Sequence, residues 1–399
     1  MIWSKQINGD KNSGIAAIFG IILLFLSFYQ HSYVLSFSGT FILVIGWMSH
    51  YYLKQIGNHL VLGNEKDHIR LSIGEENLLS IKMTQRSWLP IFRGRLKVKI
   101  DSSVEPVNFP TERSERYEMF TIPFHIRGKE TIQLTLPIKA VSRGVAKIKS
   151  LELSIDSFFG FGSVEMKYNP YIHKEFIIYP TPVIVPDTER LISTQSQGDY
   201  PVHTSLYEHL LAPIGTRDYV YSDSFQRINW KASAKTQSLQ TKVYERTAHF
   251  SWTFVINLRD PNITKQHWGT IENLESIASN IAYLAQFAVK KGIQFELFIN
   301  LRMASQTAMY HLPIGGGANH LAKALDILSR LHRRWTTLPV TKFLHFVDKQ
   351  NNNSPVIIVC GPLSEDGYES ISYMQKKGQR VYLLKDDAIN PSIVPLGRI

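Results

Sequence analysis

Cysteine is almost absent from this sequence, because Cys360 is the only one among 399 residues. A single cysteine excludes an intrachain disulfide framework, and no cysteine–histidine spacing fits a zinc site. Cys360 ends an apolar run, so we expect it to be a buried small hydrophobe. The sequence also lacks the HExxH pair of metalloproteases and the GxSxG elbow of serine hydrolases. With no catalytic motif present, we expect neither an enzyme nor a bound cofactor.

Charged residues are missing from two long stretches near the N-terminus. Residues 14–29 and 33–53 contain no Asp, Glu, Lys or Arg and are separated by only three residues. A helix needs about 20 apolar residues to cross the hydrocarbon core, and the first run reaches that length only with its flanks. A cleaved signal peptide would show one run and a cleavage site, and a buried hairpin of a soluble protein is the other alternative. We predict a transmembrane helical hairpin over residues 1–56.

Basic residues flank this predicted hairpin on one side of the membrane. Lys5 and Lys11 precede it, Lys54 follows it, and the connecting turn has no basic residue. The positive-inside rule then places both ends of the hairpin in the cytoplasm. We therefore expect a multi-pass protein of the cell membrane with its termini and soluble domains on the cytoplasmic side. The net charge of +11 favours an anionic partner or surface without choosing among them.

Short alternating segments dominate residues 57–185. Stretches such as IQLTLPI and AKIKSLELSI alternate apolar and polar residues, which is typical of strands with one solvated face. About seven such segments without a helical stretch predict an all-β antiparallel sandwich domain. The three prolines of YPTPVIVPDTER, residues 179–190, predict a linker after it.

A basic run lies inside this predicted domain. Between Lys82 and Lys99 the sequence has six basic residues and no acid. One interpretation is a solvated edge strand, because lysines on an edge block the addition of further strands. The other is contact with anionic lipid headgroups near the hairpin, worth about 1 kcal/mol per basic residue at the surface.

Strands and helices alternate in the last part of the chain, within residues 186–399. Residues 251–258 form an unbroken apolar run, and residues 270–292 carry an apolar stripe at helical spacing that begins at Thr270 and closes at Gly292. Further helices are predicted over 318–335 and 365–378, with strands over 293–300, 355–360 and 379–384. Strands separated by helices predict an α/β domain with a mainly parallel sheet covered on both faces.

A polar run, RDYVYSDSFQRINWKASAK, occupies residues 217–235, between the predicted sandwich and the first apolar strand at 251–258. It resembles the signature of the bacterial family that carries the domain of unknown function 58: Arg-x-Tyr, an acidic turn, and Arg-Ile-x-Trp-Lys-x-Ser-Ala-Arg. The matching residues are Arg217, Tyr219, Asp223, Arg227, Ile228, Asn229, Trp230, Lys231, Ser233 and Ala234, with Lys235 replacing the last arginine, followed by Lys242 and Glu245. Upstream, SRGVAKIKSLELSIDSFFGFG (142–162) and IIYPTP resemble the family's Arg-Gly turn, strand, Asp-x-Phe-Gly close and Tyr-Pro step.

The resemblance implies a fold and possible partners. It implies that the last domain is similar to a von Willebrand factor A domain. It also implies partners, because such proteins are commonly encoded beside AAA+ ATPases of the MoxR type and transglutaminase-like membrane proteins. No enzymatic activity is established for the family. These implications favour a membrane-anchored, non-catalytic adaptor or scaffold in assembly or maturation at the cell envelope.

The metal site of a von Willebrand A domain would fall at VINLRDPN. A divalent cation needs a carboxylate and two hydroxyls there, whereas this chain has Asn257, Arg259 and Pro261. The arginine would repel a cation and only Asp260 could substitute, so we expect no metal. Gly315, Gly316 and Gly317 precede the helix at 318, where their free backbone N–H groups could hold an anion. The turn lacks the residues of a phosphate loop, so a flexible entry to the helix is the favoured interpretation.

The polar run itself allows two compatible interpretations. As a structural element, Arg217 and Arg227 would pair with Asp218 and Asp223, and Trp230 would pack under the first strand of the sheet. As a docking surface, it presents residue types that dominate interface hot spots; the candidates are Arg217, Tyr219, Asp223, Arg227, Trp230, Lys231 and Glu245. Basic and aromatic residues also suit single-stranded nucleic acid, which the membrane location disfavours. The rival hypothesis is a membrane-associated hydrolase that uses the glycine turn.

Overall fold

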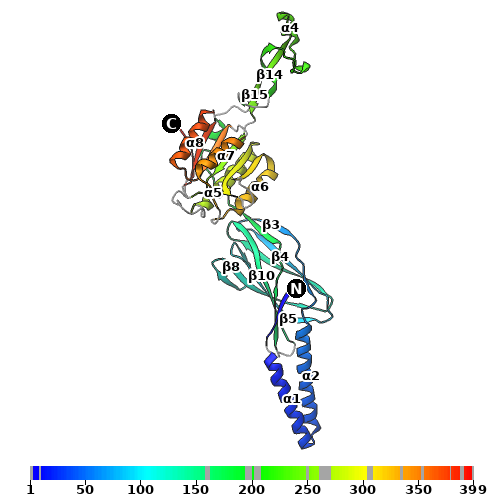
Figure 1. The fold of residues 1–399 in the computed structure, drawn as a ribbon. Coiled ribbons are helices and arrows are strands. Elements are labelled where there is room, and N and C mark those ends of the chain that lie inside the picture. Colours follow the sequence, from blue (N-terminus) through cyan, green and yellow to red (C-terminus); the bar gives the residue numbers. More distant parts are fainter. Residues whose placement is uncertain are drawn as a thin grey trace. The chain divides into compact units, whose positions relative to one another are not determined.

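The computed structural model describes residues 3–8, 10–157, 162–193, 200–201, 208–248, 251–259, 271–302, 309–332, 336–351, 355–377, 379–386 and 391–397. The chain divides into two compact units, Met1–Tyr179 and Pro180–Ile399 (Figure 1). The division falls at the start of the predicted proline-rich linker. The first unit contains both the N-terminal helices and the β-sheets that follow them.

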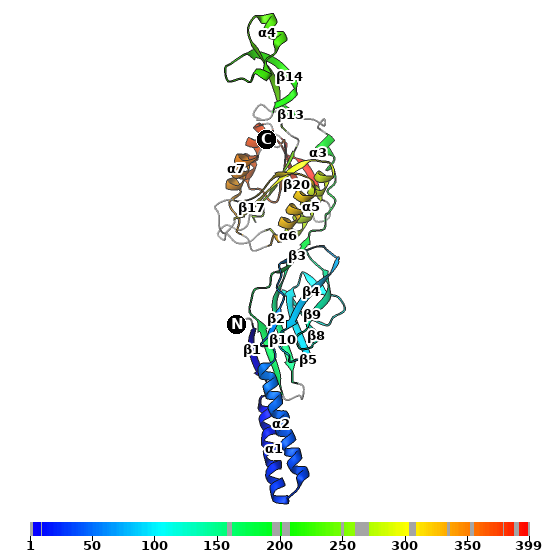
Figure 2. The same ribbon diagram turned by 90° about the vertical axis from the view of Figure 1, so that its right-hand side faces the viewer.

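Two helices form a pair at the start of the first unit, α1 (Asp10–Gln30) and α2 (Tyr33–Gln55). They lie side by side in both views (Figures 1 and 2). By length and composition α2 is able to cross a membrane, and the apolar part of α1, Gly14–Gln30, is shorter. Large apolar side chains on both helices are exposed, including Phe25, Phe28, Phe37 and Trp47.

The two helices approach closely at a pair of glycines. A Cβ at Gly39 would come within 2.9 Å of the carbonyl oxygen of Gly20 and 3.0 Å of Leu24. Small residues at such crossings let helix backbones touch, which is how helices associate in membranes. Gly46 lies further along the same helix, α2, and a Cβ there would meet no atom within 4 Å.

This contrast gives a testable expectation for the helical pair. We expect Gly39→Ala to lower stability by about 1–3 kcal/mol because the methyl group would force the helices apart. Gly46→Ala is the matched control and should leave stability nearly unchanged. Thermal unfolding of the detergent-solubilised chain measures both; equal midpoints for the two variants would show that the close approach does not contribute.

A strand that the sequence did not predict precedes the two helices. Trp3–Asn8 forms β1, which pairs antiparallel with β11 (Ser163–Tyr168). Lys5, interpreted above as a flank of the hairpin, donates from Nζ to the carbonyl oxygens of Lys54 (2.7 Å) and Ile56 (2.8 Å) at the end of α2. Burial lowers the pKa of Lys5 to about 8. β1 and Lys5 therefore tie both helix ends to the sheets.

The remaining strands of the first unit form two sheets. The larger has the order β1-β11-β10-β5-β8-β7, with β12 pairing β10 and β3 pairing β12, and the smaller has the order β2-β4-β9-β6. Their bounds are β2 Leu60–Leu62, β3 Asp67–Ser72, β4 Glu76–Gln85, β5 Ile91–Asp101, β6 Val104–Pro106, β7 Thr111–Ser114, β8 Tyr117–Ile126, β9 Thr131–Ala140, β10 Gly144–Asp156 and β12 Lys174–Tyr179. Buried side chains from both sheets form one core with Leu53 and Ile56 of the α2 end. This confirms the alternating strands and antiparallel sheets, except that β12 and β3 pair in parallel.

The basic run does not form an edge strand. β5 lies between β10 and β8, and β4 lies between β2 and β9. The edge-strand interpretation is therefore wrong, because Lys82 of β4 and Arg95, Lys97 and Lys99 of β5 lie on the solvated face of interior strands. Arg95 there pairs with Asp156 at 2.9 Å, and the Lys99 ammonium lies 3.6 Å from the centre of the Tyr117 ring.

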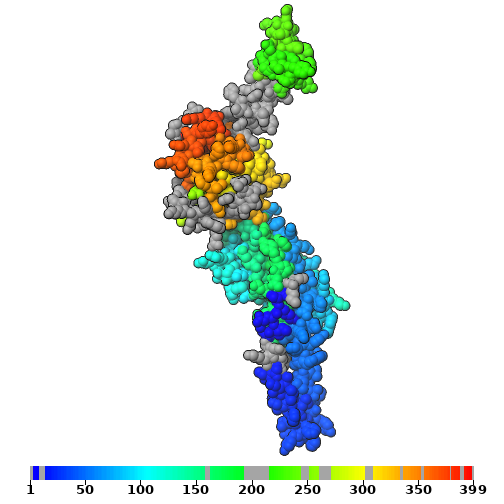
Figure 3. Space-filling model, in the orientation of Figure 1, coloured from blue at the N-terminus to red at the C-terminus, as the bar shows by residue number. Residues whose placement is uncertain are grey.

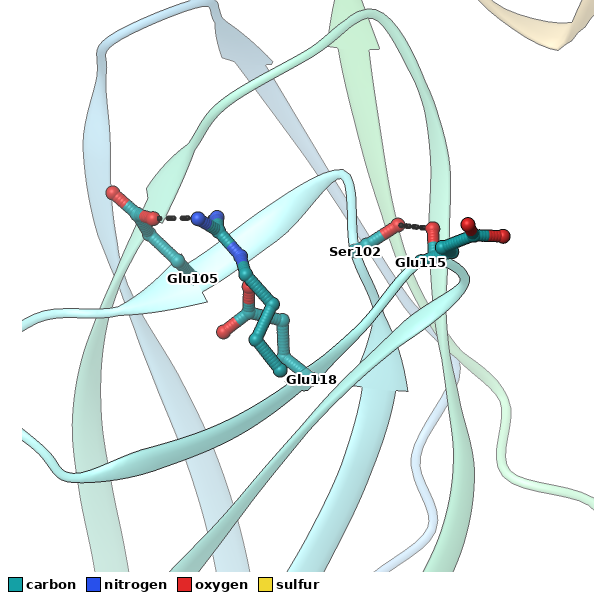
Figure 4. A network of polar contacts seen from close by, with 5 residues as sticks. Ser102, Glu105, Glu115 and Glu118 are labelled. Atoms are coloured by element: carbon teal, nitrogen blue, oxygen red, sulfur yellow. Dashed lines mark hydrogen bonds and ion pairs between the residues drawn. The ribbon is translucent and has the colours of Figure 1, made fainter.

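A polar cluster closes the end of the first unit formed by the β7–β8 turn. Arg113 contacts Glu118 at 2.6 Å and Glu105 at 3.2 Å, and Ser102 donates to the carbonyl oxygen of Glu115 (Figure 4). Glu118 is buried, and its carboxylate raises the pKa of Arg113. The arginine thus satisfies a carboxylate that burial would otherwise leave unpaired.

The second unit contains a six-stranded mixed sheet with the order β18-β17-β16-β19-β20-β21. Its strands are β16 Ser251–Ile256, β17 Gln294–Arg302, β18 Met309–Gly315, β19 Val356–Cys360, β20 Arg380–Lys385 and β21 Ser392–Pro395. The four inner strands are parallel, and the edge strands β18 and β21 are antiparallel to their neighbours. The expected parallel core is present, while the antiparallel edges were not predicted.

Helices cover both faces of this sheet (Figure 2). They are α5 Leu274–Lys290, α6 Gly317–Arg330, α7 Val340–Gln350 and α8 Glu365–Lys376, of which α7 was not predicted. Trp252 of β16 stacks on Phe287 of α5, whereas Phe298 of β17 contacts Phe346 of α7. Gly292 follows α5 with φ of +72°, as expected for a closing glycine, and the predicted cap Thr270 lies outside the described residues.

Short elements complete the unit: α3 Arg190–Ser193, η1 Phe225–Arg227, α4 Trp230–Thr236, and a small sheet of β13 Tyr200–Pro201, β14 Glu208–Asp218 and β15 Gln240–Ala248.

Candidate functional site

The polar run folds into the connection between β14 and β15, which we call the tip (residues 215–243). Figure 3 shows the tip residues, in green, as one compact lobe. Its small interior is formed by Ile228, which is buried and bridges Thr241 of β15. Because so little apolar surface is enclosed, polar contacts must hold the lobe together.

An acidic side chain organises the first half of the tip. Asp223 accepts from Arg217 Nη2 at 2.6 Å, from the Val220 N–H at 3.1 Å and from Thr241 Oγ1 at 3.2 Å. The Arg217 guanidinium is the main cause that holds the pKa of Asp223 below its ordinary value. This confirms part of the structural interpretation, since Arg217 and Asp223 pair with each other.

A short helix forms the second half. Asn229 caps α4 by accepting from the Ala232 N–H at 3.2 Å, and its own N–H donates to Gln240 O at 2.8 Å. Ser233 Oγ accepts from the Gln240 N–H at 2.8 Å. Gln240 Nε2 in turn donates to Asp218 at 2.6 Å. The polar residues of the family-like signature therefore fix α4 against β15.

Three aromatic residues of the tip face solvent. Trp230 is 66% exposed, Phe225 is 71% exposed and Tyr221 is 97% exposed. The expectation that Trp230 packs under a strand is therefore wrong, because the first turn of α4 turns its indole outward. Lys231 beside it is also exposed. Rigid aromatic side chains next to a cation are what protein interfaces use as anchors.

The seven candidate residues do not all have the same place in the tip. Arg217 and Asp223 support the lobe, and Tyr219 is half-buried with its ring 5.9 Å from that of Phe225. Arg227 ends η1 and is half-buried, whereas Trp230 and Lys231 are displayed. Glu245 belongs to β15, but its side chain lies outside the described residues. Tyr221 and Phe225 were not among the predicted residues, although Phe225 stands between polar residues inside the run.

The carboxyl edge of the mixed sheet is occupied by amides at the place where a metal would bind. Asn257 Oδ1 accepts from Asn300 Nδ2 at 2.8 Å and from the Arg259 N–H at 3.2 Å, and its Nδ2 donates to Pro362 O at 2.5 Å. Every polar atom of this buried side chain is engaged by protein. Asp260 and Pro261 lie outside the described residues, and within the described ranges no three His, Cys, Asp or Glu side chains cluster as metal ligands.

One acidic side chain joins several neighbouring polar groups at this edge. Asp386, just after β20, accepts hydrogen bonds from Asn273 (2.6 Å), Asn280 (2.8 Å) and Ser276. These bonds join the start of α5 to the sheet. Burial raises the pKa of the Cys360 thiol well above its ordinary value. A thiol that stays protonated is a poor nucleophile, in line with the expected buried hydrophobe.

The glycine turn has a steric explanation. A Cβ at Gly315 would lie 2.5 Å from Nδ1 of His320, whose Nε2 bonds the Phe295 carbonyl oxygen at 2.9 Å. Burial lowers the pKa of His320, so its neutral form donates this bond. The turn therefore makes room for an imidazole that fixes α6 to β17.

No protein-family model and no curated protein sequence matches this chain. Among solved structures, it is similar to one described as "AvmM Catalyzes Macrocyclization in Alchivemycin A Biosynthesis", with 9% identity over 32% of this chain and 93% of that chain and a TM-score of 0.21. It is also similar to a non-cellulosomal cohesin from the hyperthermophilic archaeon Archaeoglobus fulgidus, with 12% identity over 28% and 86% of the two chains and a TM-score of 0.19. Scores this low carry no argument about fold or function, so the role of this chain must be inferred from its own residues.

Proposed function

We propose that this protein is a membrane-anchored, non-catalytic adaptor that uses the tip to bind a partner protein. In this proposal it is a member of the domain of unknown function 58 family, with a β-sandwich and a von Willebrand A-like domain. The observation that carries the docking role is the exposure of Trp230 on a lobe whose polar residues are bonded to one another. A rigid display of this kind lowers the entropy lost on binding.

Membrane anchoring is supported by the helical pair. The exposed side chains of α1 and α2 are predominantly large and apolar, and water would solvate them at a cost of about 25 cal/mol per Å² of apolar surface. A bilayer removes that cost. In this proposal both helix ends and the soluble units lie on the cytoplasmic side of the cell membrane, which Lys54 and the other basic flanks support through the positive-inside rule.

The partner is proposed from chemistry and from the family resemblance together. Trp230 with Phe225 and Lys231 fits an apolar pocket with an acidic rim. The resemblance points to a MoxR-type AAA+ ATPase, with a transglutaminase-like membrane protein as a second component, in assembly or maturation at the cell envelope. Nothing in this role requires a reaction at the tip.

A pull-down with the detergent-solubilised chain tests the docking role. We expect Trp230→Ala with Lys231→Ala to lower affinity for the ATPase by about 30-fold, since a hot-spot aromatic contributes about 2 kcal/mol or more. Tyr373→Ala is the control, because Tyr373 is an exposed aromatic residue (58%) on α8, outside the tip. Full ATPase recovery by the folded double variant would refute the docking role.

A further inference from the structure

One end of the first unit holds the last turns of α2. Ser49 Oγ lies 2.5 Å from Ser157 Oγ, and Tyr52 donates from its hydroxyl to Pro90 O at 2.9 Å. Leu53 then enters the core shared by the two sheets. The loop that contains Pro90 is therefore fixed beside the point where α2 leaves the sheets.

That loop is joined to a second one. The Lys129 N–H donates to Ser87 O at 2.9 Å, and a Cβ at Gly128 would lie 2.1 Å from the Trp88 carbonyl oxygen. We call residues 86–90 and 127–130 the loop pair. The Arg86 N–H also donates to His59 O at 3.1 Å, just after α2. The loop pair is thus a close-packed surface attached to the helices.

The side chains of this surface combine one aromatic ring with positive charge. Trp88 is 69% exposed, and Arg86, Arg127 and Lys129 are exposed around it. The single acid of the two loops, Glu130, accepts from the Arg127 N–H at 2.7 Å. Phe92 (55% exposed) and the exposed Arg93 extend the surface at the start of β5. Tryptophan with arginine and lysine is the composition of a membrane–water interface.

The length of α2 brings this surface to the bilayer. From Tyr33 to its contact at Ser49 the helix rises by about 24 Å at about 1.5 Å per residue. The hydrocarbon core is about 30 Å thick, so a span of this length holds the first unit close against the membrane.

We propose that the loop pair lies in the headgroup layer of an anionic bilayer, with Trp88 inserted among the headgroups and the basic residues on lipid phosphates. The proposal rests on the membrane anchoring proposed above. It differs from the earlier interpretation of the basic run, because Lys97 and Lys99 belong to the solvated sheet face, and only Arg86 and Arg93 of that run contribute.

Site-specific fluorescence on the full chain in vesicles tests this proposal. Lys129→Cys, and Glu115→Cys at the β7–β8 turn as control, are each labelled with an environment-sensitive fluorophore; the wild-type chain, with Cys360 buried, is the blank. In vesicles of phosphatidylcholine with phosphatidylglycerol, we expect headgroup-attached quenchers to quench the label at 129 at least threefold more than the label at 115. Aqueous iodide should show the reverse order.

The outcomes separate the two proposals. Release of the chain from vesicles by alkaline carbonate refutes the membrane anchor itself. Retention of the chain with equal iodide access at positions 129 and 115 refutes the loop pair alone. If headgroup-attached quenchers quench the label at 129 equally in vesicles with and without phosphatidylglycerol, the requirement for anionic lipid is refuted.

Discussion

Replacing Glu296 by alanine is expected to lower the free energy of unfolding of the second unit by about 3–5 kcal/mol. Glu296 lies in β17 and is fully buried. Its carboxylate accepts from Thr253 Oγ1 at 2.7 Å and faces His311 Nε2 at 3.2 Å. The alanine leaves a cavity and removes the partner of a buried hydroxyl and of an imidazole.

Denaturant unfolding of the detergent-solubilised chain measures this loss. The matched variant is Glu296→Leu with Thr253→Val, which fills the space and removes the buried hydroxyl as well. It should recover part of the stability, since replacing both partners of a buried hydrogen bond costs less than removing one. A loss below about 1 kcal/mol for Glu296→Ala would contradict the role given to this contact.

Asn257→Asp is expected to lower the free energy of unfolding at neutral pH by about 3 kcal/mol, almost as much as Glu296→Ala. The side chain is buried, and its Nδ2 donates to Pro362 O at 2.5 Å, so an aspartate oxygen there would face a carbonyl oxygen. Burial and this repulsion disfavour the ionised form and raise the pKa of the introduced carboxyl in the folded state.

The sign of the pH dependence follows from that shift. A carboxyl whose pKa is higher in the folded state destabilises the protein increasingly as pH rises above the unfolded value of about 3.9. The variant should therefore be closest to the wild type near pH 4 and diverge from it toward pH 7. If the free energy of unfolding changes with pH in the same way for the variant and the wild type between pH 4 and pH 7, the amide arrangement at Asn257 is not required.

Both substitutions lie outside the tip, which separates stability from docking. A folded fraction of either variant should retain the partner affinity of the wild type, because the exposed Trp230 and the Arg217–Asp223 pair both lie within residues 215–243. Stability and binding can thus be assigned to different residues of one unit.

Local patterns predicted most of the elements. Alternation within residues 131–140 and 144–156 predicted β9 and β10, and the charge-free runs predicted α1 and α2. β1 escaped notice because WSKQIN is short, polar and placed before the helices, and it becomes a strand only by pairing with β11. The tip was recognisable from its residues, but which of them support the lobe and which are displayed was not.

The sequence alone determined the features that depend on near neighbours: the apolar helices, the alternating strands, the inner strands of the second unit with α5, α6 and α8, and the polar run at residues 217–235. Tertiary structure decided the parallel pairing of β12 with β3, the interior place of β5, the amide-filled edge at Asn257 and the outward position of Trp230. These features depend on contacts between segments far apart in the chain, and local periodicity carries no information about which distant segment meets which.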